Sequence, residues 1–313
     1  MMRAACLQIA PPALPSSRAV MERADGESFP VAIRVLSRAH RRHLLAVYGF
    51  ARLADELGDE ISGDRLAALD WLRRELDDAY AGVARHPLLV RLQQTLEECI
   101  LPREAFGRLI EANRLDQHAR HYETWKQLQE YCELSANPVG ELVLCVFDLA
   151  SPARIELSNR VCTALQLAEH LQDLSEDVRR GRFYLPARDL ERFDCSHEQL
   201  HELVSHADRD LSMRKAHSVS MARSGDFPRM TERLREAISF ETARARELLA
   251  AGTPLVAGIA GRPKLALAGF IAGGRAALDA IERADFDVLA GVPRASRGRR
   301  MRLLASVLME GRA

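Results

Sequence analysis

Residues 45–60 read LAVYGFARLADELGDE, and this stretch decides the fold class. Apolar side chains recur in it three or four positions apart, as at Val47 and Ala51, which is the spacing of an amphipathic α-helix. The same spacing returns along most of the chain, for example at Leu72 and Leu76. Runs of alternating β-branched residues between turn signals are nearly absent. We therefore predict an all-α protein.

The same stretch places polar groups on one side of its predicted helix. At 100° per residue, Tyr48, Arg52, Asp55 and Asp59 fall within roughly 60° of one another. Carboxylates four residues apart on a helix repel each other and destabilise it slightly. The pair of aspartates therefore indicates either an ordinary solvated helix face or a site where a positive charge is bound.

A second polar stripe occurs about 118 residues later in the chain. Gln166, Glu169, Asp173 and Asp177 are spaced by three, four and four residues, and apolar residues such as Leu171 flank them. Two such stripes, each set into an apolar helix, favour the binding interpretation over the solvated one. Oxygen ligands of this kind suit Mg²⁺, which keeps positions for water and for substrate phosphate.

Arginines accompany both acidic stripes. Arg52 lies one turn before Asp55, and Arg179, Arg180 and Arg182 follow Asp177 directly. Arginine binds phosphate oxygens in pairs, so these side chains are candidates for contacts with a diphosphate. The alternative is that they form ordinary surface salt bridges with the carboxylates.

The rest of the sequence bounds the size and class of the protein. The chain has 313 residues, 47% of them apolar, with 44 basic and 44 acidic side chains. The absence of net charge argues against nucleic-acid binding. Six scattered cysteines without metal-binding spacing are typical of a reduced, cytoplasmic protein. No apolar run approaches the roughly 20 residues of a membrane-spanning helix, and peripheral contact with the inner membrane stays open.

Composition also divides the chain into segments. Residues 1–27 are rich in proline, serine and alanine, which predicts a flexible lead-in without the features of a signal peptide. Residues 28–310 keep the helical pattern and predict one domain. Within it, residues 197–228 are dense in serine, histidine, aspartate and arginine, and we expect a mobile surface insertion there.

These motifs together resemble the squalene/phytoene synthase family, over nearly the whole chain from about residue 28 to 310. The resemblance is carried by Ser28-Phe29, by Tyr48, Phe50 and Arg52 before Asp55 and Asp59, by Tyr131-Cys132, by Gln166 before Asp173 and Asp177, and by GRFYLP at 181–186. The family implies an isoprenoid synthase-type bundle of α-helices around a central cavity. It also implies that the two aspartate motifs face each other across the mouth of the cavity with Mg²⁺ between them; Mn²⁺ is an alternative ion.

The resemblance assigns roles to individual residues. It implies that the metal–diphosphate cluster consists of Asp55, Asp59, Asp173 and Asp177. The residues that it implies as substrate contacts are Ser28, Phe29, Tyr48, Arg52, Asn137, Gln166, Glu169, Arg182 and Tyr184. The sequence departs from the family pattern at Glu169, where asparagine is usual, and at Glu56, where a second aspartate is usual. Both changes keep oxygen ligands, so we expect metal binding to survive them.

Finer features resemble one bacterial branch of the family. The run SANPVG at residues 135–140 is similar to the signature of members that convert presqualene diphosphate and water to hydroxysqualene and diphosphate. Its Pro138 must in any case interrupt a helix. The tyrosine that phytoene-type members carry near Gly273 and Gly274 is absent, which leaves room for water. No glycine fingerprint for a dinucleotide is present, so no NADPH requirement is predicted.

Two alternatives to this function stay open. On the same scaffold, the protein could join two prenyl diphosphates head to head, giving presqualene diphosphate, squalene or phytoene. In a different class, it could be a non-catalytic helical assembly factor. The preferred interpretation implies a C30 isoprenoid diphosphate as substrate, a presqualene diphosphate synthase upstream, and a flavin-dependent reductase downstream in a bacterial route to squalene and hopanoids.

Overall fold

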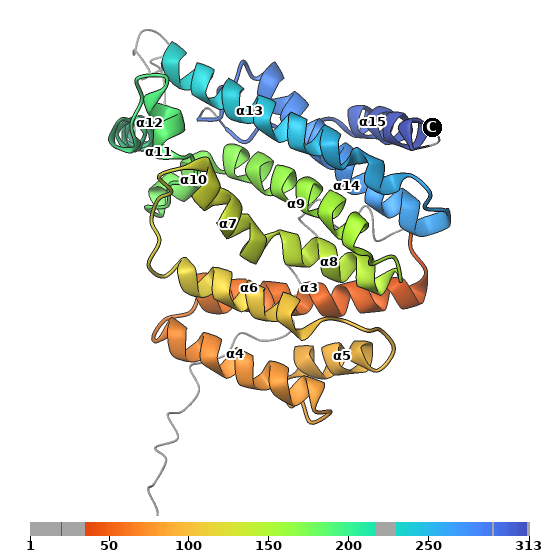
Figure 1. The fold of residues 1–313 in the computed structure, drawn as a ribbon. Helices are drawn as coiled ribbons and strands as arrows, with labels where there is room; N and C mark the ends of the chain where they lie inside the picture. The colour runs from red at the N-terminus through yellow and green to blue at the C-terminus, as the bar shows by residue number, and fades with distance from the viewer. Residues whose placement is uncertain (1–19, 21–34, 217–229, 290, 312–313) are drawn as a thin grey trace, which may run out of the picture.

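The computed structural model describes residues 20, 35–216, 230–289 and 291–311, without the side chains of 207–216. Its elements, labelled as in Figure 1, are α3 (Arg38–Asp59), α4 (Arg65–Tyr80), α5 (Pro87–Leu96), α6 (Arg103–Leu115), α7 (Trp125–Ser135), α8 (Asn137–Val146), α9 (Pro152–Gln172), α10 (Leu174–Arg179), α11 (Ala187–Glu191), α12 (His197–Ala216), α13 (Glu232–Gly252), the 3₁₀-helix η2 (Thr253–Val256), α14 (Gly261–Arg283) and α15 (Arg297–Glu310).

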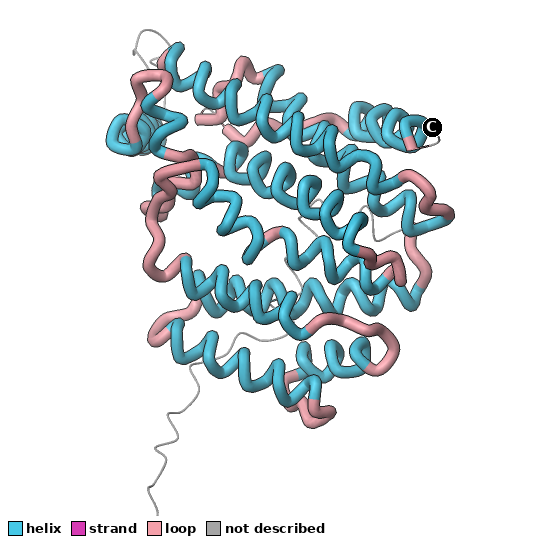
Figure 2. Tube along the Cα trace, viewed as in Figure 1, coloured by secondary structure: helices cyan, strands magenta, loops and turns pink. Residues whose placement is uncertain are grey.

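No β-strand occurs in these described residues, where helices alternate with loops (Figure 2). A single isolated bridge joins His121 to Phe183. The prediction of an all-α protein is therefore confirmed. The predicted lead-in lies outside the described residues, apart from Val20.

The helices stack in layers across the molecule (Figure 1). The helices α4 and α5 form one outer layer and pack on α3, which also contacts α6 and α8. The helix α9 packs on α8 on one side and on α13 and α14 on the other. Large apolar side chains fill these contacts, including Phe50 of α3 and Phe106 of α6, whose rings meet edge to face at 4.8 Å. Apolar contacts therefore hold α3 against α6, and the acidic residues at the end of α3 lie beside this contact.

Side chains that cap the backbone begin several of these helices. The hydroxyl of Ser37 accepts a hydrogen bond from the backbone N–H of His40 at the start of α3. Thr124 and Gln127 form a reciprocal capping box at the start of α7. Each cap satisfies N–H groups that have no partner within the helix. The sequence therefore fixes where these helices begin.

The break between α7 and α8 occurs where Pro138 was expected to interrupt a helix. Asn137 is buried beside it, and its side-chain oxygen accepts a hydrogen bond from the hydroxyl of Thr163 on α9 at 3.1 Å. A methyl group on Gly140 would lie 2.4 Å from Oγ of Ser158 and 2.5 Å from Sγ of Cys162. The run at 135–140 therefore both breaks the helix and lets α8 approach α9 closely.

The stretch 197–228, for which we expect a mobile surface insertion, is described only in part. Residues 197–216 form α12, which packs on α10 and buries Leu200 and Val204. These two apolar residues, four apart, give the segment a core-facing side despite its many polar residues. Residues 217–228, the rest of the predicted insertion, lie outside the described residues.

An ion cluster joins α13 to α11 in the interior. The Arg244 guanidinium donates to both carboxylate oxygens of Glu241, at 2.8 and 2.7 Å, and to Asp189 at 2.8 Å. It also lies over the rings of Trp125 and Phe240. Glu241 is only 2% exposed, and burial raises its pKa to about 8 although Arg244 opposes the shift. One arginine therefore compensates two carboxyl groups in this region.

None of the described helices combines the length and the hydropathy that a membrane span requires.

Candidate active site

The first acidic motif lies at the end of α3, against α6. The Asn113 amide donates to Oδ1 of Asp55 at 3.2 Å and to the carbonyl of Leu109 at 3.1 Å. A methyl group on Gly58 would lie 2.3 Å from the side-chain oxygen of Asn113. The absence of a side chain at Gly58 therefore lets α6 bring a buried amide to an aspartate whose own side chain is exposed.

Arg182 connects the two acidic motifs. Its guanidinium binds both carboxylate oxygens of Asp59, one at 3.0 Å and the other at closer range. Its backbone N–H donates to the carbonyl of Asp177 at 2.9 Å. The turn that makes this possible uses Gly181 at φ 72°, a conformation that glycine adopts without steric cost. The hydrogen bonds that Arg182 donates to Asp59 raise the pKa of its guanidinium, so this side chain stays charged.

The second acidic motif lies where α9 gives way to α10. Asp173 occupies the junction, and the N–H of Asp177 donates to its carbonyl at 2.9 Å. Burial raises the pKa of the Asp173 carboxyl, and the negative charges of Asp177 and Glu176 raise it further. This is the crowding of like charges that the spacing predicts.

A second arginine reaches between the two motifs. The Arg180 guanidinium lies 2.9 Å from a carboxylate oxygen of Glu176 and 3.9 Å from one of Glu60. Glu60 directly follows the end of α3, and Glu176 belongs to α10. Arg180 and Arg182 together therefore hold the ends of α3 and α10 at one place on the molecule.

Aromatic rings form a cluster beside the second acidic motif. The ring of His170 stacks on Tyr184 at 3.7 Å, and Tyr131 and Tyr122 each lie within 6 Å of Tyr184. Nδ1 of His170 is 3.7 Å from a carboxylate oxygen of Asp177. The cluster thus places polar atoms of aromatic side chains beside the second motif.

Asp116 is a carboxyl group to which the sequence analysis assigned no role, although its run at 112–117 also resembles the bacterial branch of the family. The Tyr131 hydroxyl donates to it at 2.9 Å. Burial raises its pKa to about 6, while the Tyr131 hydrogen bond and the charge of Arg182 oppose the shift. The charges of Asp59 and Asp55 add to the rise, which places Asp116 in the electrostatic field of the first motif.

We predict that Asp116→Asn stabilises the protein only at higher pH. The folded state binds the Asp116 proton more tightly than the unfolded state, so its stabilising effect is complete below about pH 4 and is lost as the pH rises through 6. An amide cannot ionise, so the variant should gain up to about 3 kcal/mol at pH 8 and almost nothing at about pH 3.5. Urea denaturation at the two pH values measures this. An equal change at both would contradict it.

The remaining candidate residues lie on α3, α8 and α9 or outside the described residues. Arg52 forms a 3.7 Å pair with Glu56, and Tyr48 lies on the same helix, α3. The Gln166 amide contacts the His170 ring at 3.1 Å. Glu169 is exposed on α9. Asn137 lies at the α8–α9 contact, where it accepts a hydrogen bond from Thr163, three residues before Gln166 on α9. Ser28 and Phe29 lie outside the described residues.

Other groups found here had weaker signals in the sequence. Asn113 and Asp116 belong to the run ANRLDQ at 112–117, which shows no charge repeat of its own. His170 occurs inside the second polar stripe, between Glu169 and Asp173. Its helix position alone could not show that it stacks on Tyr184, a residue brought there by the turn at Gly181.

The donor chemistry of the site fits a divalent cation. Its carboxylates are hard oxygen ligands, and the crowding at Asp173 is a charge excess that a cation would relieve. Within the described part of the chain, no three His, Cys, Asp or Glu side chains are arranged to enclose an ion. Mg²⁺ usually takes only one or two carboxylates together with water and substrate phosphate, so a closed protein cage is not required.

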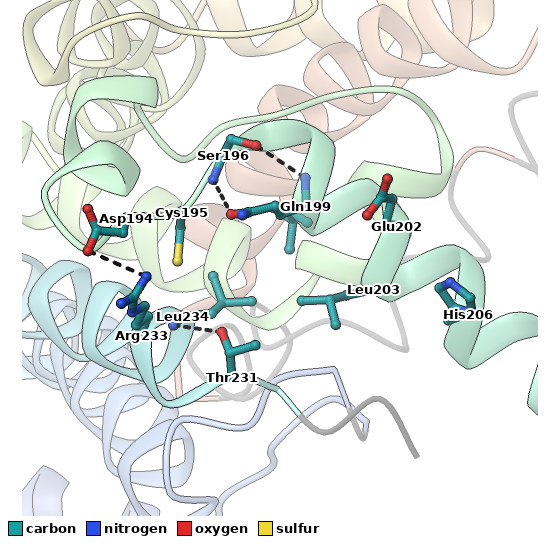
Figure 3. A pocket seen from close by; sticks show the side chains of 11 residues that line it. Asp194, Cys195, Ser196, Gln199, Glu202, Leu203, His206, Thr231, Arg233 and Leu234 are labelled. Carbon is teal, nitrogen blue, oxygen red and sulfur yellow. Dashed lines mark hydrogen bonds and ion pairs between the residues drawn. The ribbon is translucent and has the colours of Figure 1, made fainter. Parts of the chain in front are cut away.

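Two hollows occur elsewhere in the molecule. One of about 300 Å³ lies between α12 and the start of α13; its lining includes Cys195, Leu203 and Leu234, with the Asp194–Arg233 ion pair at 3.4 Å (Figure 3). The other, of about 350 Å³, is lined by residues of α4, α6 and α7 and by His118. Neither contains a residue of the acidic motifs. The apolar cavity for a C30 chain stays a prediction.

Comparison with known proteins shows that the chain is similar to squalene and phytoene synthases. A family model described as squalene/phytoene synthase matches residues 23–302. Hydroxysqualene synthase of Zymomonas mobilis is 36% identical over 190 residues, which cover 54% of this chain and 61% of that protein. Presqualene diphosphate synthase of Rhodopseudomonas palustris is 35% identical over 170 residues, covering 53% and 61%. The matches thus span about three-fifths of the length of these curated relatives.

Solved structures extend the similarity over more of the chain. The crystal structure of squalene synthase HpnC from Alicyclobacillus acidocaldarius has 38% sequence identity and a TM-score of 0.74, covering 87% of this chain and 93% of that one. A dehydrosqualene synthase, with 23% identity and a TM-score of 0.75, shares the fold. The all-α arrangement is therefore that of known isoprenoid synthases.

Proposed function

The chain belongs to the squalene/phytoene synthase family, and from this we propose that it converts presqualene diphosphate and water to hydroxysqualene and diphosphate. The observation that carries the proposal is the double contact of Arg182, which binds the Asp59 carboxylate and the Asp177 backbone at once. It brings two acidic motifs, 118 residues apart, to one place. A site of this composition suits the departure of a diphosphate group.

The reaction begins when the carbon–oxygen bond to the diphosphate breaks and its electron pair leaves with the oxygen. Asp55, Asp59, Asp173 and Asp177 would hold a divalent cation, Mg²⁺ or Mn²⁺, which supplies Lewis-acid stabilisation of the leaving anion. Arg180 and Arg182 lie beside these carboxylates and can donate to phosphate oxygens. Their positive charge therefore favours ionisation at this end of the bundle.

The second half of the reaction forms the product. After rearrangement of the carbocation, a water oxygen bonds to carbon and loses a proton, giving hydroxysqualene. No electrons are added, so the proposed reaction needs no NADPH. The apolar part of the substrate must be buried meanwhile, because stray water would trap the cation too early. We assign this role to buried apolar residues of α8, α9 and α14, such as Leu142, Leu167 and Leu278.

The choice of branch is supported by two observations. The run at 135–140 resembles the hydroxysqualene-forming branch, and several relatives at 34–36% identity are hydroxysqualene synthases. A presqualene diphosphate synthase at 35% identity keeps head-to-head condensation of two farnesyl diphosphates as the second candidate. Phytoene synthases at 31–33% identity use the same family fold.

Incubating the purified full chain with Mg²⁺ and a single substrate tests the proposal. With presqualene diphosphate, we expect hydroxysqualene by gas chromatography–mass spectrometry, with the product oxygen labelled from ¹⁸O-water. With farnesyl diphosphate alone, we expect no C30 product. The reverse result would support the condensation reaction. No turnover of either substrate, or of geranylgeranyl diphosphate, would support the non-catalytic alternative.

The proposed reaction also defines the neighbouring steps. A presqualene diphosphate synthase must supply the substrate, and a reductase, which we propose to be flavin-dependent, must remove the hydroxyl group of the product to give squalene. Adding NADPH to the assay should change neither rate nor product.

A further inference from the structure

The last helix, α15, carries an unusual concentration of positive charge. Between Gly291 and Met309 the sequence contains Arg294, Arg297, Arg299, Arg300 and Arg302 and no acidic residue. The chain as a whole has equal numbers of basic and acidic side chains. The positive charge is therefore a local feature of this segment.

Most of these arginines are not used within the protein. Arg299 pairs with Asp279 of α14. In the described ranges, no carboxylate pairs with the other four, Arg294, Arg297, Arg300 and Arg302. An arginine that stabilises the fold needs a partner, so these four side chains are available to an external anion.

Apolar side chains share the outer side of α15 with the arginines. Met301 is 62% exposed and Met309 is 64% exposed, and Val292 just before the helix is 48% exposed. At 100° per residue, Met301, Arg302, Ala305 and Met309 fall within about 100° of one another, and all four are exposed. Exposed methionines of this kind are costly in water and are typical of a surface that contacts something apolar.

The inner side of α15 is held firmly to the body of the protein. Val307 is buried, and Leu303, Leu304 and Leu308 pack on the core. At one end Arg299 binds Asp279, and at the other Arg275 of α14 binds Glu310 at 2.7 Å. The outer side is therefore a fixed surface at the edge of the molecule, outside α14 (Figure 1).

From this combination we propose that the outer side of α15, with Val292 and Arg294 before it, docks on an anionic membrane surface. The guanidinium groups fit lipid phosphates in pairs, and unbranched methionine side chains can enter the boundary between headgroups and acyl chains. A nucleic acid would satisfy the arginines but not the exposed methionines. The helical part of the surface lies on α15, whereas the acidic motifs lie on α3, α9 and α10. The segment before α15 approaches the second motif, because the Pro293 carbonyl accepts a hydrogen bond from the Gln172 amide, next to Asp173.

Vesicle co-sedimentation without substrate tests this surface independently of catalysis. The full chain should bind vesicles of phosphatidylcholine with phosphatidylglycerol, should not bind phosphatidylcholine alone, and should dissociate as salt is raised. Each basic residue near such a surface contributes about fivefold to binding. Arg297→Glu with Arg302→Glu should therefore weaken binding by at least about 25-fold.

Matched variants distinguish the surface from general charge effects. Arg74→Glu with Arg91→Glu makes the same charge change at two exposed arginines of α4 and α5 and should alter binding little. Met301→Ser with Met309→Ser keeps the charge and should weaken vesicle binding several-fold. Equal losses in both arginine pairs, no effect of the methionine pair, or tighter binding to duplex DNA than to vesicles would overturn the proposal. Circular dichroism confirms that each variant is folded.

Discussion

Asp173→Asn is expected to lower kcat/KM for presqualene diphosphate by about 10²- to 10³-fold while the protein stays folded. The reason is that the amide keeps the size of the side chain but removes its negative charge, which we propose holds the cation that stabilises the leaving diphosphate. Asp55→Asn should cause a loss of the same order, because the proposed cation site uses both motifs. Product formation is measured at several Mg²⁺ concentrations.

A matched control separates this effect from any general effect of the change. Asp148 is exposed and adopts a positive φ of 56°, a conformation that asparagine also tolerates, so Asp148→Asn should leave activity unchanged. The Asp173 variant should also need more Mg²⁺ for half-maximal rate. Full activity of both site variants would exclude the proposed role of these carboxylates.

Arg244→Met is expected to lower the free energy of unfolding by about 3–5 kcal/mol at pH 9. Methionine keeps much of the apolar packing on Trp125 and Phe240, but it leaves Glu241 and Asp189 without their common partner, and unpaired buried charges are costly. Burial raises the pKa of Glu241 to about 8, so this carboxyl is protonated at pH 6 and needs less compensation. The loss should therefore be smaller at pH 6.

Urea denaturation at both pH values measures the effect. Adding Glu241→Gln to Arg244→Met should restore part of the lost stability at pH 9, since one buried charge is then absent. Arg160→Met is the control, because Arg160 forms an exposed pair with Glu156 on α9, and such pairs contribute at most about 1 kcal/mol. An Arg244 variant no less stable than this control would show that the cluster is not stabilising.

Helical periodicity was enough to predict the fold class, because apolar spacing reports which side of each segment is buried. It also predicted the break at Pro138, since proline cannot donate the required hydrogen bond. In the stretch from residue 197 the helix α12 was not specified from the sequence, and the expected mobility stays a prediction. The polar composition of this stretch concealed Leu200 and Val204, which bury one side of α12, and two apolar residues are too few to stand out in a sequence.

The candidate site was predictable in part. The aspartates were singled out because carboxylates at helical spacing repel unless they bind something, and Arg182 because it closely follows Asp177. Asn113 reaches Asp55 only because Gly58 allows α6 to come close, and Asp116 acquires its raised pKa from burial. Both depend on contacts between segments distant in the sequence, which no local pattern records. The expectation that Arg182 faces substrate also omitted its contact with Asp59.

That contact between Arg182 and Asp59 has a consequence for how the protein matures. Some small proteins fold only when their metal is bound, and chelators denature them. Here an arginine from the same polypeptide already neutralises part of the acidic end of the bundle. We therefore expect the polypeptide to reach its native shape without a dissolved ion, with the loading of ligands as a separate, later event.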